Sequence, residues 1–170
     1  MEKKGVLYSI KRERVMRHKM KVLYLHGLES KQGGKKVDFL AKKYEVIAPA
    51  MDYHNPKLFE TTLELVQEFI PDVIIGSSMG GYFAYKLATI TGTPVVLLNP
   101  AMHSRAFEPE GVYEGTKEVI GTMIMGHKDD VIDPKQTINL LRKAIRNGQL
   151  RTYLKDHEHR TPLKIFKDYL

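Results

Sequence analysis

From residue 20 onward, short apolar runs alternate with amphipathic segments, and this alternation is what most limits the possible folds. Nearly continuous apolar runs of this kind are typical of strands buried on both faces of a sheet. Strands that alternate with helices pair in parallel through right-handed crossovers. We therefore expect an α/β fold: a doubly wound, mostly parallel sheet of five to six strands with helices on both faces.

The elements have recognisable boundaries in the sequence. The expected strands cover residues 21–25, 44–48, 72–75, 94–98, 119–125 and 150–154. The expected helices cover residues 33–43, 58–70, 82–91, 134–146 and 161–170. Asp133 before Pro134, and Thr161 before Pro162, are each typical of an N-cap followed by a proline in the first helical turn.

The net charge of +7 is concentrated at the N-terminus. Residues 1–19 contain seven basic and two acidic side chains, whereas the other 151 residues contain 20 basic and 18 acidic ones. A nucleic-acid-binding domain should carry a basic patch on its folded face, so we expect no nucleic-acid partner. We interpret residues 1–19 as a basic extension (an edge strand or hairpin, or a tail) and residues 20–170 as a single domain.

Several classes of protein are disfavoured by what the chain lacks. It has no cysteine, which excludes disulfides, thiolate metal sites and a cysteine nucleophile. No apolar run approaches the roughly 18–20 residues that span a bilayer, and the charged N-terminus has no apolar signal region. We therefore expect a cytoplasmic protein with no membrane partner, of unspecified oligomeric state. The histidines lack metal-binding spacing, so neither a metal nor a cofactor is expected.

A candidate nucleophile follows the third expected strand, at the edge of a parallel sheet where ligands gather. Ser78 lies in the segment GSSMGG at 76–81. A nucleophile on a sharp strand-to-helix turn needs Gly76 and Gly80 because the neighbouring chain passes very close. The N–H groups that begin the next helix could stabilise an oxyanion. The sequence therefore predicts that Ser78 is the nucleophile of a hydrolase.

An aspartate and a histidine follow later strands, in the order Ser, Asp, His that is typical of α/β-hydrolases. Asp129 is the preferred triad acid, with Asp130 as an alternative, while Asp133 fits a helix cap better. His159 is the preferred base and His157 is the alternative. We expect the histidine that is not the base to lie at the surface. A triad of this kind transfers an acyl group through a serine ester.

The residues after the first expected strand fit an oxyanion-hole loop. They are His26, Gly27 and Leu28. The backbone N–H of Leu28 would join that of Met79 to hold the negative charge of the tetrahedral intermediate. We expect His26 to brace this loop by hydrogen bonding rather than to act as a base.

Five segments carry the motifs of a known family: VLYLHGLES at 22–30, IAPA at 47–50, IIGSSMGGYFA at 74–84, LLNPA at 97–101 and KDDVID at 128–133. With them the chain resembles the small bacterial esterases of the YqiA-like family in the α/β-hydrolase superfamily. The resemblance implies Ser78, Asp129 and His159 as the triad, with Leu28 and Met79 as oxyanion donors. The sequence DHEHR at 156–160 departs from the family's usual single histidine, so His157 remains an alternative base.

These observations predict a serine hydrolase acting on small or short-chain carboxylic esters or thioesters. About 17 residues, 102–118, separate LLNPA from the next strand, where larger hydrolases build a lid. We therefore expect a minimal fold with no large lid and an open site. The alternatives are a peptidase or thioesterase of the same fold, or a binding protein that keeps the fold without catalysis.

Overall fold

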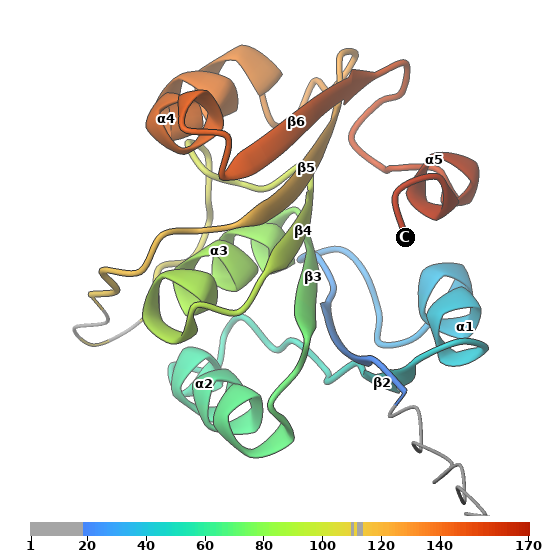
Figure 1. Ribbon diagram of the computed structural model, residues 1–170, viewed down its shortest axis with the longest axis vertical. Helices are drawn as coiled ribbons and strands as arrows, with labels where there is room; N and C mark the ends of the chain where they lie inside the picture. Colours follow the sequence, from blue (N-terminus) through green and yellow to red (C-terminus); the bar gives the residue numbers. More distant parts are fainter. Residues whose placement is uncertain (1–18, 110, 112–113) are drawn as a thin grey trace, which may run out of the picture.

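A computed structural model describes residues 19–109, 111 and 114–170 of the protein. Six strands within these residues form one sheet in the order β2-β1-β3-β4-β5-β6, and every neighbouring pair is parallel (Figure 1). The strands are β1 (Lys21–Leu25), β2 (Glu45–Ile47), β3 (Val73–Ser77), β4 (Val95–Leu98), β5 (Gly121–Gly126) and β6 (Leu150–Lys155). The predicted doubly wound parallel sheet is confirmed.

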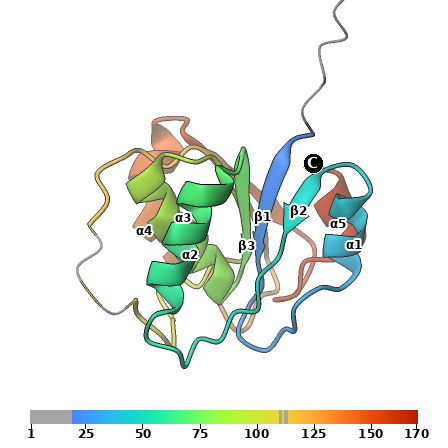
Figure 2. The same cartoon turned by 90° about the horizontal axis from the view of Figure 1, so that it is seen from below.

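Helices cover both faces of this sheet. The helices are α1 (Lys35–Ala41), α2 (Leu58–Phe69), α3 (Met79–Thr91), α4 (Pro134–Arg146) and α5 (Leu163–Lys167). Figures 1 and 2 show α1 and α5 on one face and the other three helices on the opposite face. The sheet is therefore the middle layer of three.

Strands β1 to β5 each supply side chains to both hydrophobic cores, because the side chains of a strand alternate between the two faces of the sheet. In β1, Leu23 and Leu25 belong to the cluster beneath α2, α3 and α4, whereas Val22 and Tyr24 belong to the cluster beneath α1 and α5. Burial on both faces explains why the strands read as unbroken apolar runs in the sequence. Phe166 of α5 is fully buried in the cluster beneath α1 and α5.

The order of the strands creates a crevice at their carboxyl ends. The chain runs from β1 outward to β2, and then returns to place β3 on the other side of β1. The loops that follow β1 and β3 therefore diverge, and ligands bind in open α/β sheets at such switch points. His26 follows β1 and Ser78 follows β3, so both lie at this point.

Three helices begin elsewhere than the sequence predicts. Helix α1 begins at Lys35 rather than Gly33. Helix α3 begins at Met79 rather than Tyr82, so Gly80 and Gly81 lie inside the helix instead of in a turn. Helix α5 begins at Leu163, and its N-cap position is Pro162 rather than Thr161, whose hydroxyl is bound elsewhere. The predicted cap of α4 is confirmed, since the Asp133 carboxylate accepts a hydrogen bond of 2.8 Å from the backbone N–H of Lys135.

The connection between β4 and β5 carries no helix within its described residues, in agreement with the absence of a large lid. The interpretations of residues 1–19 as an edge strand, a hairpin or a tail lie outside the described residues, apart from Lys19. None of the helices in the described part of the chain has the length and apolar character to cross a bilayer.

Candidate active site

Ser78 lies at the sharp turn between β3 and α3, with φ of 54° and ψ of −117°. A positive φ is rare for a residue with a side chain, and it turns the Ser78 hydroxyl out of the sheet. A Cβ atom at Gly76 would collide with the backbone of Gly80, and one at Gly80 would collide with the backbone of Leu25. The two glycines are therefore needed because strand, turn and helix pass each other at backbone contact distance.

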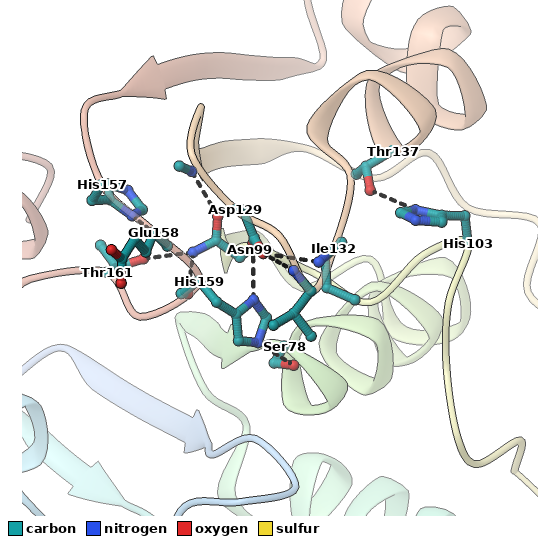
Figure 3. A network of polar contacts seen from close by, with 12 residues as sticks. Ser78, Asn99, His103, Asp129, Ile132, Thr137, His157, Glu158, His159 and Thr161 are labelled. Carbon is teal, nitrogen blue, oxygen red and sulfur yellow. Dashed lines mark hydrogen bonds and ion pairs between the residues drawn. The ribbon is translucent and has the colours of Figure 1, made fainter.

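Two hydrogen bonds connect Ser78 to a histidine and an aspartate from later loops (Figure 3). Nε2 of His159 is 3.0 Å from Oγ of Ser78, and Nδ1 of His159 is 2.8 Å from Oδ2 of Asp129. The carboxylate of Asp129 is fully buried. Its other oxygen, Oδ1, accepts hydrogen bonds from the backbone N–H groups of Val131 and Ile132, at 2.9 and 2.8 Å. These bonds fix the carboxylate in the orientation that meets the imidazole.

The other candidate acids lie away from this imidazole. Asp130 is exposed. Asp133 caps α4, where the hydrogen bond from the Lys135 N–H holds the pKa of its carboxyl below the ordinary value. Of the three candidate acids, Asp129 is the one whose carboxylate is hydrogen-bonded to His159.

His157 does not reach Ser78, and it is not a surface residue either. Only 6% of it is exposed, so the expectation that the second histidine lies at the surface is wrong. Its Nδ1 donates a 2.6 Å hydrogen bond to the carbonyl of Glu158, and its buried Nε2 has no hydrogen-bond partner among the described residues. His157 is buried because its loop packs against Gly126, where an added Cβ would collide with the carbonyls of His157 and Glu158. The missing side chain lets this loop pack directly on the end of β5.

His26 makes hydrogen bonds within its own loop, which follows β1, and to the segment that follows β2. Its Nε2 accepts a 3.1 Å hydrogen bond from the backbone N–H of Met51. The proton is therefore on Nδ1, which donates a 2.9 Å hydrogen bond to the carbonyl of Gly27. The hydroxyl of Tyr53 donates to the carbonyl of His26 at 2.5 Å. Both imidazole nitrogens of His26 are used in these contacts.

The loop after β1 lies close to the side chain of Ser78. A Cβ at Gly27 would lie 3.1 Å from the Cβ of Ser78. The chain then turns, with the Ser30 N–H donating to the Gly27 carbonyl at 3.1 Å, and Leu28 is the second residue of this turn. Met79 is the first residue of α3, where a backbone N–H has no acceptor within the helix. Leu28 and Met79 both line the cavity that contains Ser78.

That cavity has a volume of about 360 Å³. Its lining combines the polar atoms of Ser78 and His159 with apolar side chains and with the exposed charged residues Glu29, Arg105 and Arg160. Leu28 and Val131 are exposed hydrophobic residues, 43% and 56% accessible, and both line the cavity. No group of His, Asp or Glu side chains suited to a metal ion occurs in the described part of the chain.

Sequence reasoning missed Asn99, which follows β4 and is 1% exposed. Its side-chain amide donates a 2.6 Å hydrogen bond to the carbonyl of His159 and accepts a 2.7 Å hydrogen bond from the N–H of Gly126. Figure 3 shows it among Ser78, Asp129 and His159. The sequence signal that points to Asn99 is a polar residue directly after a fully apolar strand and before a proline.

The six-stranded parallel sheet with helices on both faces is the fold of the α/β-hydrolases. A family model described as "Uncharacterised protein family (UPF0227)" matches residues 21–110, which is more than half of the chain. The protein belongs to this family, and the resemblance to the YqiA-like group is confirmed. A search among curated proteins gives no match.

Solved structures of similar fold support the assignment. A Xanthomonas campestris protein proposed to be a hydrolase of the alpha/beta superfamily is 18% identical, with a TM-score of 0.68 over 88% of this chain and 92% of that one. An esterase of Pyrococcus furiosus is 15% identical, with a TM-score of 0.68 over 89% and 78% of the two chains. A monoacylglycerol lipase of Paleococcus ferrophilus is 12% identical, with a TM-score of 0.65 over 88% and 90%. At these identities the likeness shows the α/β-hydrolase fold.

Proposed function

We propose that the protein is a serine hydrolase that cleaves small or short-chain carboxylic esters or thioesters through an acyl-enzyme. The observation that carries this proposal is the hydrogen-bonded series from Ser78 Oγ through the His159 imidazole to the Asp129 carboxylate, with distances of 3.0 and 2.8 Å. Nucleophile, base and orienting acid in this geometry define a triad by role.

The three residues of the series have different roles in the reaction. Ser78 Oγ attacks the carbonyl carbon while Nε2 of His159 takes the hydroxyl proton. Asp129 keeps the proton of Nδ1 directed toward itself and stabilises the imidazolium. The imidazolium then protonates the leaving alcohol or thiol, and a serine ester remains. Water attacks this ester with His159 again as base, which releases the acid and restores the hydroxyl of Ser78.

The developing oxyanion is assigned to two backbone N–H groups, those of Leu28 and Met79. The support for this assignment is that both residues line the cavity beside Ser78 and that Met79 opens helix α3. A helix N-terminus also directs the positive end of its dipole at the same place. Donors that are fixed before the reaction stabilise the oxyanion without a cost of reorganisation.

The substrate class follows from the size and lining of the cavity. A volume of about 360 Å³ is at the small end of the range of ligand pockets, about 300–1,000 Å³. The apolar side chains of Leu28 and Val131 offer contacts to a short acyl or alcohol group. The fold neighbours that are named as an esterase and a monoacylglycerol lipase agree with an ester as the scissile group.

The test is a chain-length series of p-nitrophenyl esters with the wild type and Ser78→Ala. We expect kcat/KM to be highest for acetate or butyrate and to fall with longer acyl chains. Ser78→Ala should lose at least about 10³-fold in kcat, with unchanged thermal unfolding. A preference for long chains would contradict the proposed substrate class, and full activity in Ser78→Ala would contradict the proposed mechanism.

A further inference from the structure

We propose that Asn99 is the positioning residue that holds the main chain of His159 in register with Ser78 and Asp129. This inference rests on the proposed function for its catalytic consequence. Asn99 does not touch the reacting atoms and would act only through the histidine. Its side chain is the polar junction between the ends of β4, β5 and β6 (Figure 3).

The segment around Asn99 is hydrogen-bonded to the main chain of the nucleophile, Ser78. The carbonyl of Leu98 accepts a 2.9 Å hydrogen bond from the Ser78 N–H. The N–H of Ala101 donates a 3.0 Å hydrogen bond to the Ser78 carbonyl. Asn99 lies between these two contacts, so its backbone is fixed relative to the main chain of Ser78.

The side chain of Asn99 is hydrogen-bonded to the loop that carries the base, His159. Its Nδ2 donates hydrogen bonds to the carbonyl of His159 at 2.6 Å and to Oγ1 of Thr161 at 3.2 Å. Both acceptors belong to the loop after β6. Fixing the carbonyl of His159 fixes the Cα from which its imidazole extends to Ser78.

The side-chain amide of Asn99 is also connected, through Gly126, to the acid Asp129. Oδ1 of Asn99 accepts a 2.7 Å hydrogen bond from the N–H of Gly126. The carbonyl of Gly126 in turn accepts a 3.2 Å hydrogen bond from the N–H of Asp129. One side chain therefore joins the main-chain segments that carry nucleophile, base and acid.

Asparagine meets the requirements of this position. The site needs an acceptor for Gly126 and a donor for His159, and a primary amide supplies both. Aspartate has the same shape but no donor, and leucine has neither group. The φ of Asn99 is 44°, a left-handed conformation that asparagine and glycine adopt more easily than other residues.

The test compares Asn99→Gly and Asn99→Asp with the control Asn147→Gly. The first variant tolerates the backbone conformation and deletes the amide, and the second replaces the donor by an acceptor. Asn147 is exposed at the end of α4, and its side chain makes no interaction among those described. The readouts are kcat and KM for p-nitrophenyl acetate, thermal unfolding, and the downfield proton NMR signal of the His159 Nδ1–H, assigned by its loss in His159→Gln.

We expect kcat to fall by about 10- to 100-fold in both Asn99 variants, because a displacement of about 1 Å costs about 10² in rate. KM should stay within about threefold, since uniform binding is not removed. The downfield signal should broaden or disappear while the spectrum remains that of a folded protein. Asn147→Gly should match the wild type in all three readouts.

Wild-type kcat together with an intact downfield signal in folded Asn99→Gly would overturn the proposal. If both Asn99 variants fail to fold, Thr161→Val and Thr161→Ser replace them, because serine keeps the acceptor for the Asn99 amide and valine removes it. Loss of kcat and of signal sharpness in Thr161→Val alone supports positioning, and equal behaviour of the pair contradicts it.

The NMR readout separates this proposal from the proposed function. The signal of the His159 Nδ1–H depends on the contact with Asp129 and needs no substrate. If the wild type hydrolyses no ester but Asn99→Gly loses the signal, the proposed function fails and the positioning role stands. If the wild type is active and Asn99→Gly keeps both signal and rate, only the positioning role fails.

Discussion

Oγ of Ser78 and Nε2 of His159 are 3.0 Å apart, although 81 residues separate them in the chain. The distance allows direct transfer of the serine proton in the ground state. It results from two independent backbone features: the left-handed turn at Ser78 and the loop of His159 that packs on the end of β5.

Asp129→Asn should lower kcat by roughly 10³- to 10⁴-fold, because the amide can stabilise the wrong imidazole tautomer and no longer stabilises the imidazolium. Thermal unfolding should change little, since the substitution is isosteric. The matched control is Asp130→Asn, at an exposed position one residue further, and it should keep activity. Steady-state kinetics on p-nitrophenyl acetate measures kcat for both variants. Equal losses of kcat in the two would refute the assignment of Asp129 as the acid.

The two histidines should respond differently to substitution. His159→Ala should lose at least about 10³-fold in kcat, since Ser78 loses its base. His157→Ala should keep kcat within about tenfold but lower the free energy of unfolding by about 1–3 kcal/mol, because a buried side chain is removed. Kinetics together with chemical denaturation measures both effects. The reverse pattern would transfer the role of base to His157.

Leu28→Pro should lower kcat by about 10²- to 10³-fold, the effect of losing one oxyanion donor. Proline is favoured at the second position of a turn, where Leu28 lies, so the fold should tolerate it while the N–H is lost. Leu28→Ala keeps the N–H and should keep kcat within a few-fold, with the larger effect on KM. Equal kcat in the proline and alanine variants would exclude Leu28 as a donor.

Gly126→Ala should reduce both activity and stability, because the new Cβ collides with the carbonyls of His157 and Glu158 and displaces the loop of His159. The control is Gly148→Ala, where nothing lies within 4 Å of the added Cβ and only the backbone conformation is strained. That strain should cost about 1–2 kcal/mol of stability and leave kcat unchanged. Differential scanning calorimetry and steady-state kinetics separate the two effects. A fully active Gly126→Ala would show that the loop does not depend on this contact.

The sequence allowed the sheet and the position of Ser78 to be predicted because local chemistry determines both. The apolar run Val95–Leu98 reads as a strand because both faces of β4 are buried. Gly76 is required by its contact with the backbone of Gly80 across the turn, and Gly80 by its contact with the backbone of Leu25 at the end of β1. The sequence predicts a start of α3 three residues too late, because Gly80 and Gly81 are typical of a turn, whereas here they are helical residues in close contact with other segments.

The geometry around the base was beyond sequence reasoning because distant contacts create it. His157 and His159 are two residues apart on one loop, and their local sequence does not distinguish them. The carbonyl of His159 is held by Asn99, which lies 60 positions earlier. Thr161 looked like a helix cap, but the same amide binds its hydroxyl. Pairings of this kind appear only when the ends of three strands meet.

Labelling with a fluorophosphonate probe shows whether Ser78 is an activated nucleophile. Intact-mass and peptide analysis of folded wild-type protein should show a single adduct on the peptide that contains Ser78. The adduct should be absent in Ser78→Ala, retained in Ser77→Ala, and formed far more slowly in His159→Ala. An unlabelled Ser78 in folded protein, with no hydrolysis of p-nitrophenyl acetate, would contradict the account and favour a binding protein that has only the fold of a hydrolase.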